Sequence, residues 1–145
     1  MEFKSVHKAA STPRRMSPGA AGFDLAACIP DGDLFVDIPP HTTVKIRSGL
    51  AFAIPEGHFG AIYPRSGIST KRGLRLANGV AVIDSDYRGE VMLPLYNDGD
   101  EVQRVYHGDR IAQMIIQPYE PCTMTEVKKL SDTERGKGGF GSTGR

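Results

Sequence analysis

Hydrophobic and polar side chains alternate with a period of two along much of the middle of the chain. In residues 44–48 apolar positions alternate with lysine and arginine, and in residues 50–54 large apolar side chains alternate with small ones. This period is typical of β-strands that bury one face. Four further strands are predicted at residues 58–63, 90–96, 101–106 and 110–117.

Glycine and proline interrupt the chain so often, 17 and 10 times, that the apolar recurrence of an amphipathic helix is almost absent. One short helix is predicted at residues 66–72, where we expect Gly67 and Gly73 to limit it. Turn-forming residues lie between the predicted strands at 39–40, 55–57, 97–100 and 107–109. Short strands at this spacing predict an all-β sandwich or jelly roll.

Length and charge narrow the class of protein. A chain of 145 residues fits one domain, and its net charge of +1 is too balanced for the broad basic surface of a nucleic-acid binder. Any anion site must therefore be local. Cys28 and Cys122 form no Cys-x-x-Cys pair, and no apolar leader or membrane span is visible, so we expect a soluble cytoplasmic protein without membrane partners.

The tail contains five glycines in residues 135–145. Consecutive glycine N–H groups can form an anion-binding concavity, Ser142 and Thr143 add hydroxyls, Arg135 offers a fork for phosphate, and Phe140 could cover a flat base. A disordered linker is the alternative. The tail is not a dinucleotide-binding fingerprint, because too few residues follow it to form a helix, nor a Walker A loop, because Ser142 occupies the lysine position.

Other segments offer polar groups at turns. Asp84 and Asp86 would face one side of an extended chain as base and support, although an acidic hairpin turn is the alternative. Residues 63–67 combine arginine, a hydroxyl and a flexible backbone, which suits a phosphate, with a surface turn as the alternative. Residues 11–19, which include Arg14 and Arg15, are expected to form a solvated basic loop.

Five segments in this order resemble the motifs of the trimeric dUTPase family. They are residues 21–25 (AGFDL), 64–67 (PRSG), 78–90, 108–113 (GDRIAQ) and 135–144, and the resemblance runs from about residue 18 to residue 144. The family implies an all-β, jelly-roll-like (β-clip) single domain, residues 1–131, and a flexible glycine-rich C-terminal arm, residues 132–145, that completes the active site. It also implies a homotrimer with each site at a subunit interface, built from three subunits.

The implied reaction is Mg²⁺-dependent hydrolysis of dUTP to dUMP and pyrophosphate, by water attacking the α-phosphorus. It supplies dUMP for thymidylate synthesis and keeps uracil out of DNA. By the resemblance, Asp84 is the general base and contacts the 3′-hydroxyl, and Tyr87 stacks on the sugar and excludes a 2′-hydroxyl. The other implied substrate contacts are Asn78, Val82 and Ile83 for uracil, Met92 beside the nucleoside, Arg65, Ser66, Gly67 and Gln113 for phosphates, Phe140 over uracil, and Arg135, Gly141, Ser142 and Thr143 for the γ-phosphate.

The resemblance makes Asp24 a metal contact through water only. His7, His41, His58 and His107 are isolated in sequence, so we expect no direct protein ligand, which suits Mg²⁺ held by phosphates and waters. One departure is Ala81 where the family usually has glycine, and its methyl group could alter how the backbone approaches the base. The competing interpretations are a dCTP deaminase, a non-catalytic nucleotide-binding β module, and a structural jelly roll such as a lectin or capsid subunit.

Overall fold

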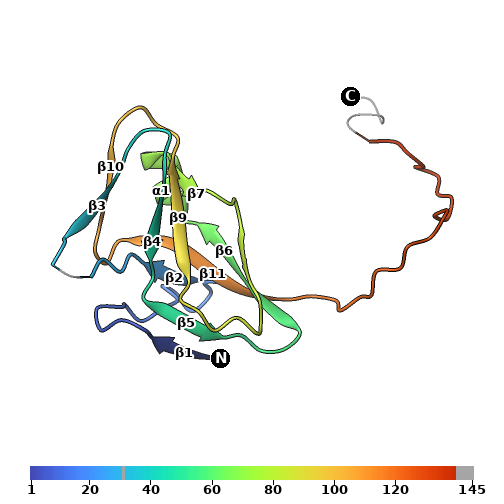
Figure 1. Ribbon diagram of the computed structural model, residues 1–145, viewed down its shortest axis with the longest axis horizontal. Coiled ribbons are helices and arrows are strands. Elements are labelled where there is room, and N and C mark those ends of the chain that lie inside the picture. Colours follow the sequence, from blue (N-terminus) through green and yellow to red (C-terminus); the bar gives the residue numbers. More distant parts are fainter. Residues whose placement is uncertain (31, 140–145) are drawn as a thin grey trace.

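The computed structural model describes residues 1–30 and 32–139, and within them it is built of strands and one short helix (Figure 1). The strands are β1 (Glu2–Ser5), β2 (Phe23–Ala26), β3 (Phe35–Ile38), β4 (Thr43–Arg47), β5 (Leu50–Ala53), β6 (His58–Pro64), β7 (Leu74–Leu76), β8 (Ala81–Ile83), β9 (Met92–Asn97), β10 (Gln103–Tyr106) and β11 (Arg110–Pro118). The helix is α1 (Ser66–Arg72). The predicted all-β fold class is confirmed.

The described strands form antiparallel sheets that enclose one core. The largest sheet has the order β2-β11-β6-β8, a second has the order β4-β9-β7, and β1-β5 and β10-β3 are two-stranded. Alternate residues of β9 are buried, as a strand with one face on a core requires, so that Leu93 and Leu95 join Leu25, Ile62 and Met114 in one hydrophobic cluster. Every sheet therefore has a face toward the same interior.

Two buried polar side chains inside this body are hydrogen-bonded. The Asn97 amide donates to the carbonyls of Ile38 and Glu101, at 2.9 and 2.7 Å, and its oxygen accepts from the Gly99 N–H. The Ser48 hydroxyl donates to the Val91 carbonyl at 2.6 Å. Because buried polar groups without partners are costly, these bonds fix the turns that follow β9 and β4.

The predicted strands lie within two residues of their observed bounds, whereas β1, β2, β3, β7 and β8 were not predicted. The helix has its predicted bounds and ends at Gly73, whose φ of 62° is left-handed, but Gly67 does not shorten it. The predicted strand at 44–48 ends early because Gly49 turns with φ 71°, and a Cβ there would lie 2.7 Å from that of Ala10. β7 and β8 have only three residues each, too few to show a period.

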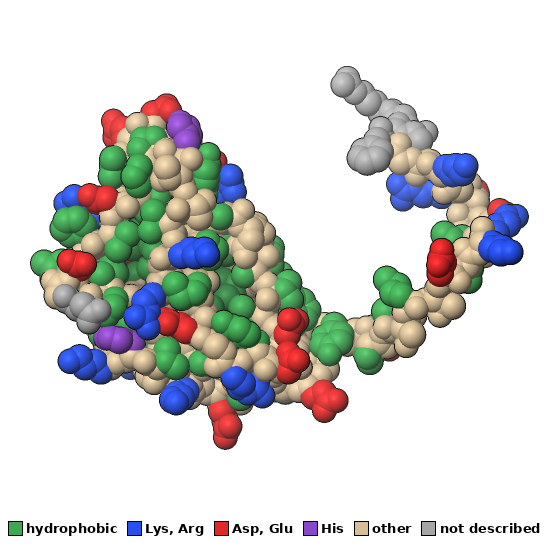
Figure 2. All heavy atoms as spheres, viewed as in Figure 1, with side chains coloured by type: hydrophobic (Ala, Val, Ile, Leu, Met, Phe, Trp, Pro, Cys, Tyr) green, Lys and Arg blue, Asp and Glu red, His purple; other side chains and the backbone are tan. Residues whose placement is uncertain are grey.

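After β11 the chain leaves the body. Tyr119 still donates to the Gly57 carbonyl, but residues 119–137 are exposed and run outward (Figure 1). The proposed division at residue 131 stays a prediction. No helix in the described ranges has the length and apolar character needed to cross a bilayer. Figure 2 shows basic and acidic side chains interspersed over the visible face of the body.

Candidate active site

Neighbouring strands of the largest sheet bring together a group of polar side chains, here called the Asp24 cluster: Asp24, Arg65, Arg110 and Gln113. Gln113 of β11 pairs in register with Asp24 of β2. The carboxylate of Asp24, 11% exposed, lies 3.1 Å from Arg65 Nε and 3.3 Å from Arg110 Nη1. Two guanidiniums face one carboxylate, so these three side chains carry a net positive charge and suit a polyanion.

Further hydrogen bonds fix Arg65 and Gln113 of this cluster. The Gln113 amide donates to the Pro64 carbonyl at 3.2 Å, and Arg65 Nη1 donates to the Arg110 carbonyl at 3.2 Å. Sequence analysis assigned roles to Asp24, Arg65 and Gln113 but none to Arg110. Arg110 lies within the recognised motif at residues 108–113, so its positive charge in that motif was the signal that could have identified it.

Helix α1 begins directly after Arg65, which occupies the N-cap position with extended backbone (φ −90°, ψ 140°). Ser66 and Gly67 form the exposed first turn, and Ile68 anchors the helix in the core. Gly67 has open space where a Cβ would lie. The predicted phosphate residues Arg65, Ser66 and Gly67 are thus placed at the same edge of the sheet as Asp24 and Gln113.

A second set of predicted residues surrounds a different cavity, here called the Tyr87 hollow. Its volume is about 180 Å³, and its lining includes Val82, Ile83, Asp84, Tyr87 and Met92. Asn78 lies in the turn before β8, where its carbonyl accepts from the Val80 N–H, and it does not line this hollow. A larger hollow of about 550 Å³ also has Asp84 in its lining, so this exposed carboxylate borders two cavities.

The methyl group of Ala81 packs into the hydrophobic core, because β8 alternates and Ala81 faces inward with 8% exposure. Val82, the next residue, faces outward with 59% exposure. Ala81 is therefore not among the residues that line the Tyr87 hollow. The methyl that distinguishes this chain from the usual glycine therefore points into the core, and its effect on the backbone's approach to a base stays a prediction.

Glu90 holds the loop between β8 and β9, a role that sequence analysis missed. Arg47 donates to both of its carboxylate oxygens, at 2.8–3.1 Å, and the Gly49 N–H donates to Oε1 at 2.8 Å. Burial alone would raise the pKa of Glu90, but these hydrogen bonds outweigh it and hold the pKa below its ordinary value. The Tyr87 hydroxyl donates to the Glu90 carbonyl at 3.0 Å.

The Asp24 cluster and the Tyr87 hollow lie at opposite ends of β6. Ile83, the residue before Asp84, pairs with Gly60, whereas Arg65 follows the far end of the same strand. Five strand steps of about 3.3 Å separate Gly60 from Arg65, or roughly 17 Å. One chain therefore does not bring its predicted base and its predicted phosphate residues into one pocket.

The arm also stays away from both places in this single chain. Arg135 Nε donates to the Gly138 carbonyl at 2.9 Å, and Gly136 N–H donates to the Thr133 carbonyl, so this part of the arm bonds locally. The predicted contacts Phe140, Gly141, Ser142 and Thr143 lie outside the described residues.

The described residues contain no group of three or more histidine, cysteine, aspartate or glutamate side chains that could hold a metal. Each histidine ring is hydrogen-bonded to another group of the chain instead. The partners are the Ala9 N–H for His7, the Asp100 carboxylate for His41, the Glu56 carbonyl for His58 and the Ile29 N–H for His107. Each oxygen of Asp24 already faces a guanidinium. This donor set fits a cation that keeps its water shell and is carried by phosphates, not a protein cage.

Comparison with protein families gives one match, a family described as dUTPase, over residues 8–144. Among curated relatives, the deoxyuridine 5′-triphosphate nucleotidohydrolase of Syntrophotalea carbinolica is 44% identical over 144 residues, 99% of this chain and 96% of the relative. The enzyme of the same name from Desulfitobacterium hafniense is 48% identical over 138 residues, 94% of this chain and 89% of the relative. Because both relatives are nucleotidohydrolases by name, they support neither of two competing interpretations, a dCTP deaminase or a structural jelly roll.

Solved structures give the same result. The dUTPase of Staphylococcus bacteriophage 80alpha with dUPNHPP superposes with a TM-score of 0.89 at 28% identity, covering 99% of this chain and 98% of that one. The dUTPase of phage phi11 of S. aureus, at 22% identity and a TM-score of 0.79, covers 91% of this chain and 98% of that one and shares the fold. The jelly-roll-like fold class is thereby confirmed.

Proposed function

The chain belongs to the dUTPase family and is an enzyme that hydrolyses dUTP, and from this premise we propose that Asp84 activates the attacking water and that the α-phosphorus is attacked. The observation that carries the proposal is the position of Asp84, an exposed carboxylate at the border of two hollows. A positioned carboxylate base contributes about 10²–10⁴ in rate.

In the proposed step the Asp84 carboxylate accepts a proton from a water molecule while the oxygen of that water bonds to the α-phosphorus. The bond from that phosphorus to the bridging oxygen of the β-phosphate breaks, and the electron pair leaves with pyrophosphate. The products are dUMP and pyrophosphate, which is how the enzyme would supply dUMP for thymidylate synthesis and keep uracil out of DNA. Asp86 lines the larger hollow together with Asp84 and would add a second negative charge beside the base.

We propose that the nucleoside occupies the Tyr87 hollow. β8 is the edge strand of its sheet, so on the side away from β6 the backbone groups of Val82 and Ile83 have no strand partner within the described chain. Such an edge offers both donors and acceptors, which is what the hydrogen-bonding side of uracil requires. Tyr87 and Met92 provide apolar walls for the sugar and base.

The separation of the two half-sites supports a homotrimer with sites at subunit interfaces. Roughly 17 Å along β6 is too far for one chain to offer Asp84 and Arg65 to the same triphosphate. A second copy would place its Asp24 cluster against the Tyr87 hollow, with Ser66, Gly67 and Gln113 on the phosphates. The outward arm would reach a further subunit's site, where Arg135 and residues 140–143 would close over the substrate.

Mg²⁺ is proposed as the cofactor, with Asp24 as its protein contact through water. The ion would supply charge neutralisation for the phosphates. Asp24 suits this limited role because Arg65 and Arg110 hold its carboxylate in place. Mg²⁺ usually keeps several waters and is bound through few carboxylates, so a contact through water is sufficient. The two free thiols, Cys28 and the exposed Cys122, suit the reducing cytoplasm in which we propose the enzyme works.

We expect Asp84→Asn to bind a non-hydrolysable dUTP analogue as tightly as the wild type but to lose about 10²–10⁴ in kcat, because the amide cannot accept the proton. Analogue binding by calorimetry and dUMP formation measure the two properties. Asp86→Asn is the matched control and should keep most activity. Full activity in Asp84→Asn would contradict its role as base.

Hydrolysis in ¹⁸O-labelled water separates the site of attack from the identity of the base. Label in dUMP is the expected result, because the oxygen from water bonds to the α-phosphorus. Label in pyrophosphate would place the attack on the β-phosphorus and overturn the proposed step.

A further inference from the structure

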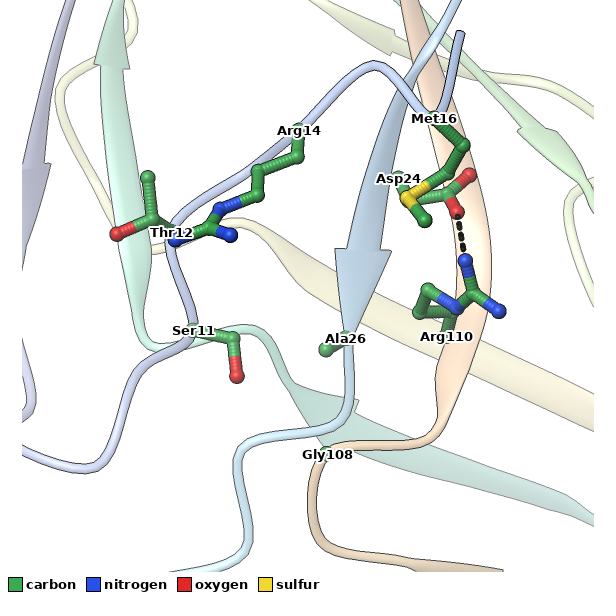
Figure 3. A pocket seen from close by; sticks show the side chains of 8 residues that line it. All are labelled: Ser11, Thr12, Arg14, Met16, Asp24, Ala26, Gly108 and Arg110. Carbon is green, nitrogen blue, oxygen red and sulfur yellow. Dashed lines mark hydrogen bonds and ion pairs between the residues drawn. The ribbon is translucent and has the colours of Figure 1, made fainter.

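The basic segment before β2 forms one wall of a cavity of about 390 Å³, here called the Arg14 hollow (Figure 3). Ser11, Thr12 and Arg14 contribute from this segment, and Asp24 and Arg110 contribute from β2 and β11. Figure 3 shows Arg14 reaching toward Thr12 on one side, with the ion pair of Arg110 and Asp24 on the other. A segment expected to be a solvated loop therefore borders the Asp24 cluster.

The backbone of Arg14 is held against the free edge of β2. The Asp24 N–H donates to the Arg14 carbonyl at 2.9 Å, and the two residues form an antiparallel bridge. Gln113 pairs with Asp24 from the opposite side, so Arg14, Asp24 and Gln113 are neighbours in one row across the sheet. Adjacent strands lie about 4.8 Å apart, which places the Arg14 backbone one strand spacing from the Asp24 cluster.

The polar groups of this wall have unused hydrogen-bonding capacity. Among the described residues, the side chains of Arg14, Ser11 and Thr12 make no hydrogen bond or ion pair. A guanidinium provides five N–H donors, and each hydroxyl provides one more. Arg15 differs, because its guanidinium lies 4.6 Å from the ring centroid of Phe23.

The charges around the hollow favour an anion. Arg14 and Arg110 line it with Asp24, and Asp24 is shared with a third guanidinium, that of Arg65. Arg65 and Arg110 pair with this carboxylate, whereas the Arg14 guanidinium on the opposite wall has no carboxylate partner among the described residues. Guanidinium and hydroxyl donors on one wall and a guanidinium on the other match the oxygens of a phosphate group, which Arg binds through paired hydrogen bonds.

We propose that the Arg14 hollow binds a pyrophosphate group, with Arg14, Thr12 and Ser11 as its donors. This inference rests on the proposed function, because Asp24 and Arg65 are there assigned to the phosphate end of the substrate. The pyrophosphate group has two sources: the β- and γ-phosphates of bound dUTP, or the pyrophosphate released after cleavage. Arg14 in either case adds a contact that lies outside the five family motifs.

Calorimetric titration of the full-length enzyme with inorganic pyrophosphate, with and without Mg²⁺, tests the site without turnover. We expect Arg14→Gln to raise the Kd for pyrophosphate about tenfold, the cost of one charge-assisted contact. Arg15→Gln is the matched control, since it removes the same charge one residue away and should change Kd by less than about twofold. Arg14→Lys should recover part of the affinity because it keeps the charge but loses the planar fork.

Kinetics distinguish the two sources of the group. A tenfold rise in KM for dUTP in Arg14→Gln assigns the site to the substrate, whereas an unchanged KM with weaker inhibition by pyrophosphate assigns it to the product. Equal Kd values for Arg14→Gln and Arg15→Gln would overturn the inference. Failure of the Asp84 mechanism would appear instead as full hydrolysis by Asp84→Asn, and it would leave the pyrophosphate titration unaffected.

Discussion

Gly89 lies so close to Tyr87 that no side chain fits between them. A Cβ added at Gly89 would lie 2.6 Å from Tyr87 Cζ, well inside contact distance. The ring is also held by the hydrogen bond from its hydroxyl to the Glu90 carbonyl. Glycine at this position therefore sets where the Tyr87 ring lies at the wall of the Tyr87 hollow.

We expect Gly89→Ala to displace the Tyr87 ring, lower kcat/KM for dUTP about tenfold, and reduce the preference for dUTP over UTP, since Tyr87 is proposed to exclude the 2′-hydroxyl. Tyr87 is 44% exposed, so its ring can move away and the free energy of unfolding should change little. Competition assays with dUTP and UTP measure the preference. Gly19→Ala, where a Cβ meets nothing within 4 Å, is the control. An unchanged preference in Gly89→Ala would show that the ring position does not set sugar selectivity.

At this scale the sequence pointed to residues whose chemistry is visible in their type. Asp84, Arg65 and Gln113 could be selected as base and phosphate contacts, by type and by motif. Glu90, Gly89 and Arg14 could not, because their roles come from what they contact: a guanidinium from β4, an aromatic ring, and the free edge of β2. Neither a contact between distant segments nor the packing of Gly89 against Tyr87, two residues away, leaves a recognisable pattern in the sequence.

The loop between β8 and β9 is the element on which the proposed site depends most. Glu90 ties it to Arg47 of β4 and to the Gly49 turn, while the Val91 N–H donates to the Leu50 carbonyl at 2.8 Å. The side chain of Glu90 is 18% exposed, so solvent screens this ion pair less than a surface pair. The loop that carries Asp84 and Tyr87 is therefore anchored to a second sheet.

Glu90→Gln should lower the free energy of unfolding by about 1–3 kcal/mol at neutral pH, since a charged hydrogen-bonded pair is lost. Because the folded pKa of Glu90 is lowered, this contribution is fully present above the unfolded pKa of about 4.3 and is lost as pH falls through the folded value. Denaturant unfolding of both proteins from pH 7 to pH 3 measures the difference. A gap that stays constant to pH 3 would contradict the ionic origin of the effect.

Alternation predicted the longer strands, and turn residues predicted their ends, because both signals are local. β7 and β8 were missed since three residues cannot display a period of two. β8 nevertheless carries the proposed uracil edge, and its place beside β6 comes from the order of strands in the sheet. Strand order depends on the whole fold and is not written in any one segment.

At the scale of the whole molecule, the two half-sites face opposite ends of β6, and the arm leaves the body altogether (Figure 1). In the proposed oligomer each chain would supply only part of a site. If Asp84 and Arg65 of different subunits meet in one site, two inactive variants can restore each other, because each supplies the part that the other lacks.

Mixed trimers of Asp84→Asn and Arg65→Gln should therefore regain about a third of wild-type activity. In a ring of three subunits that contains both variants, one of the interfaces joins an intact Asp84 to an intact Arg65, so roughly one site in three is complete. Co-expression with two tags, purification of mixed oligomers and assay of dUMP formation give the measurement. Mixtures of each variant with itself remain inactive as controls. No recovery in verified mixed oligomers would mean that both residues serve one site from the same chain.

If the half-sites separated along β6 meet only between subunits, as proposed, the enzyme's output would also depend on its own abundance. Newly made chains would contribute nothing until they meet others, so total activity would rise more steeply than protein level at low expression and linearly once assembly is complete. Dilution would lower the activity per chain, and at low expression a small change in synthesis would change the cell's capacity to exclude uracil more than proportionally.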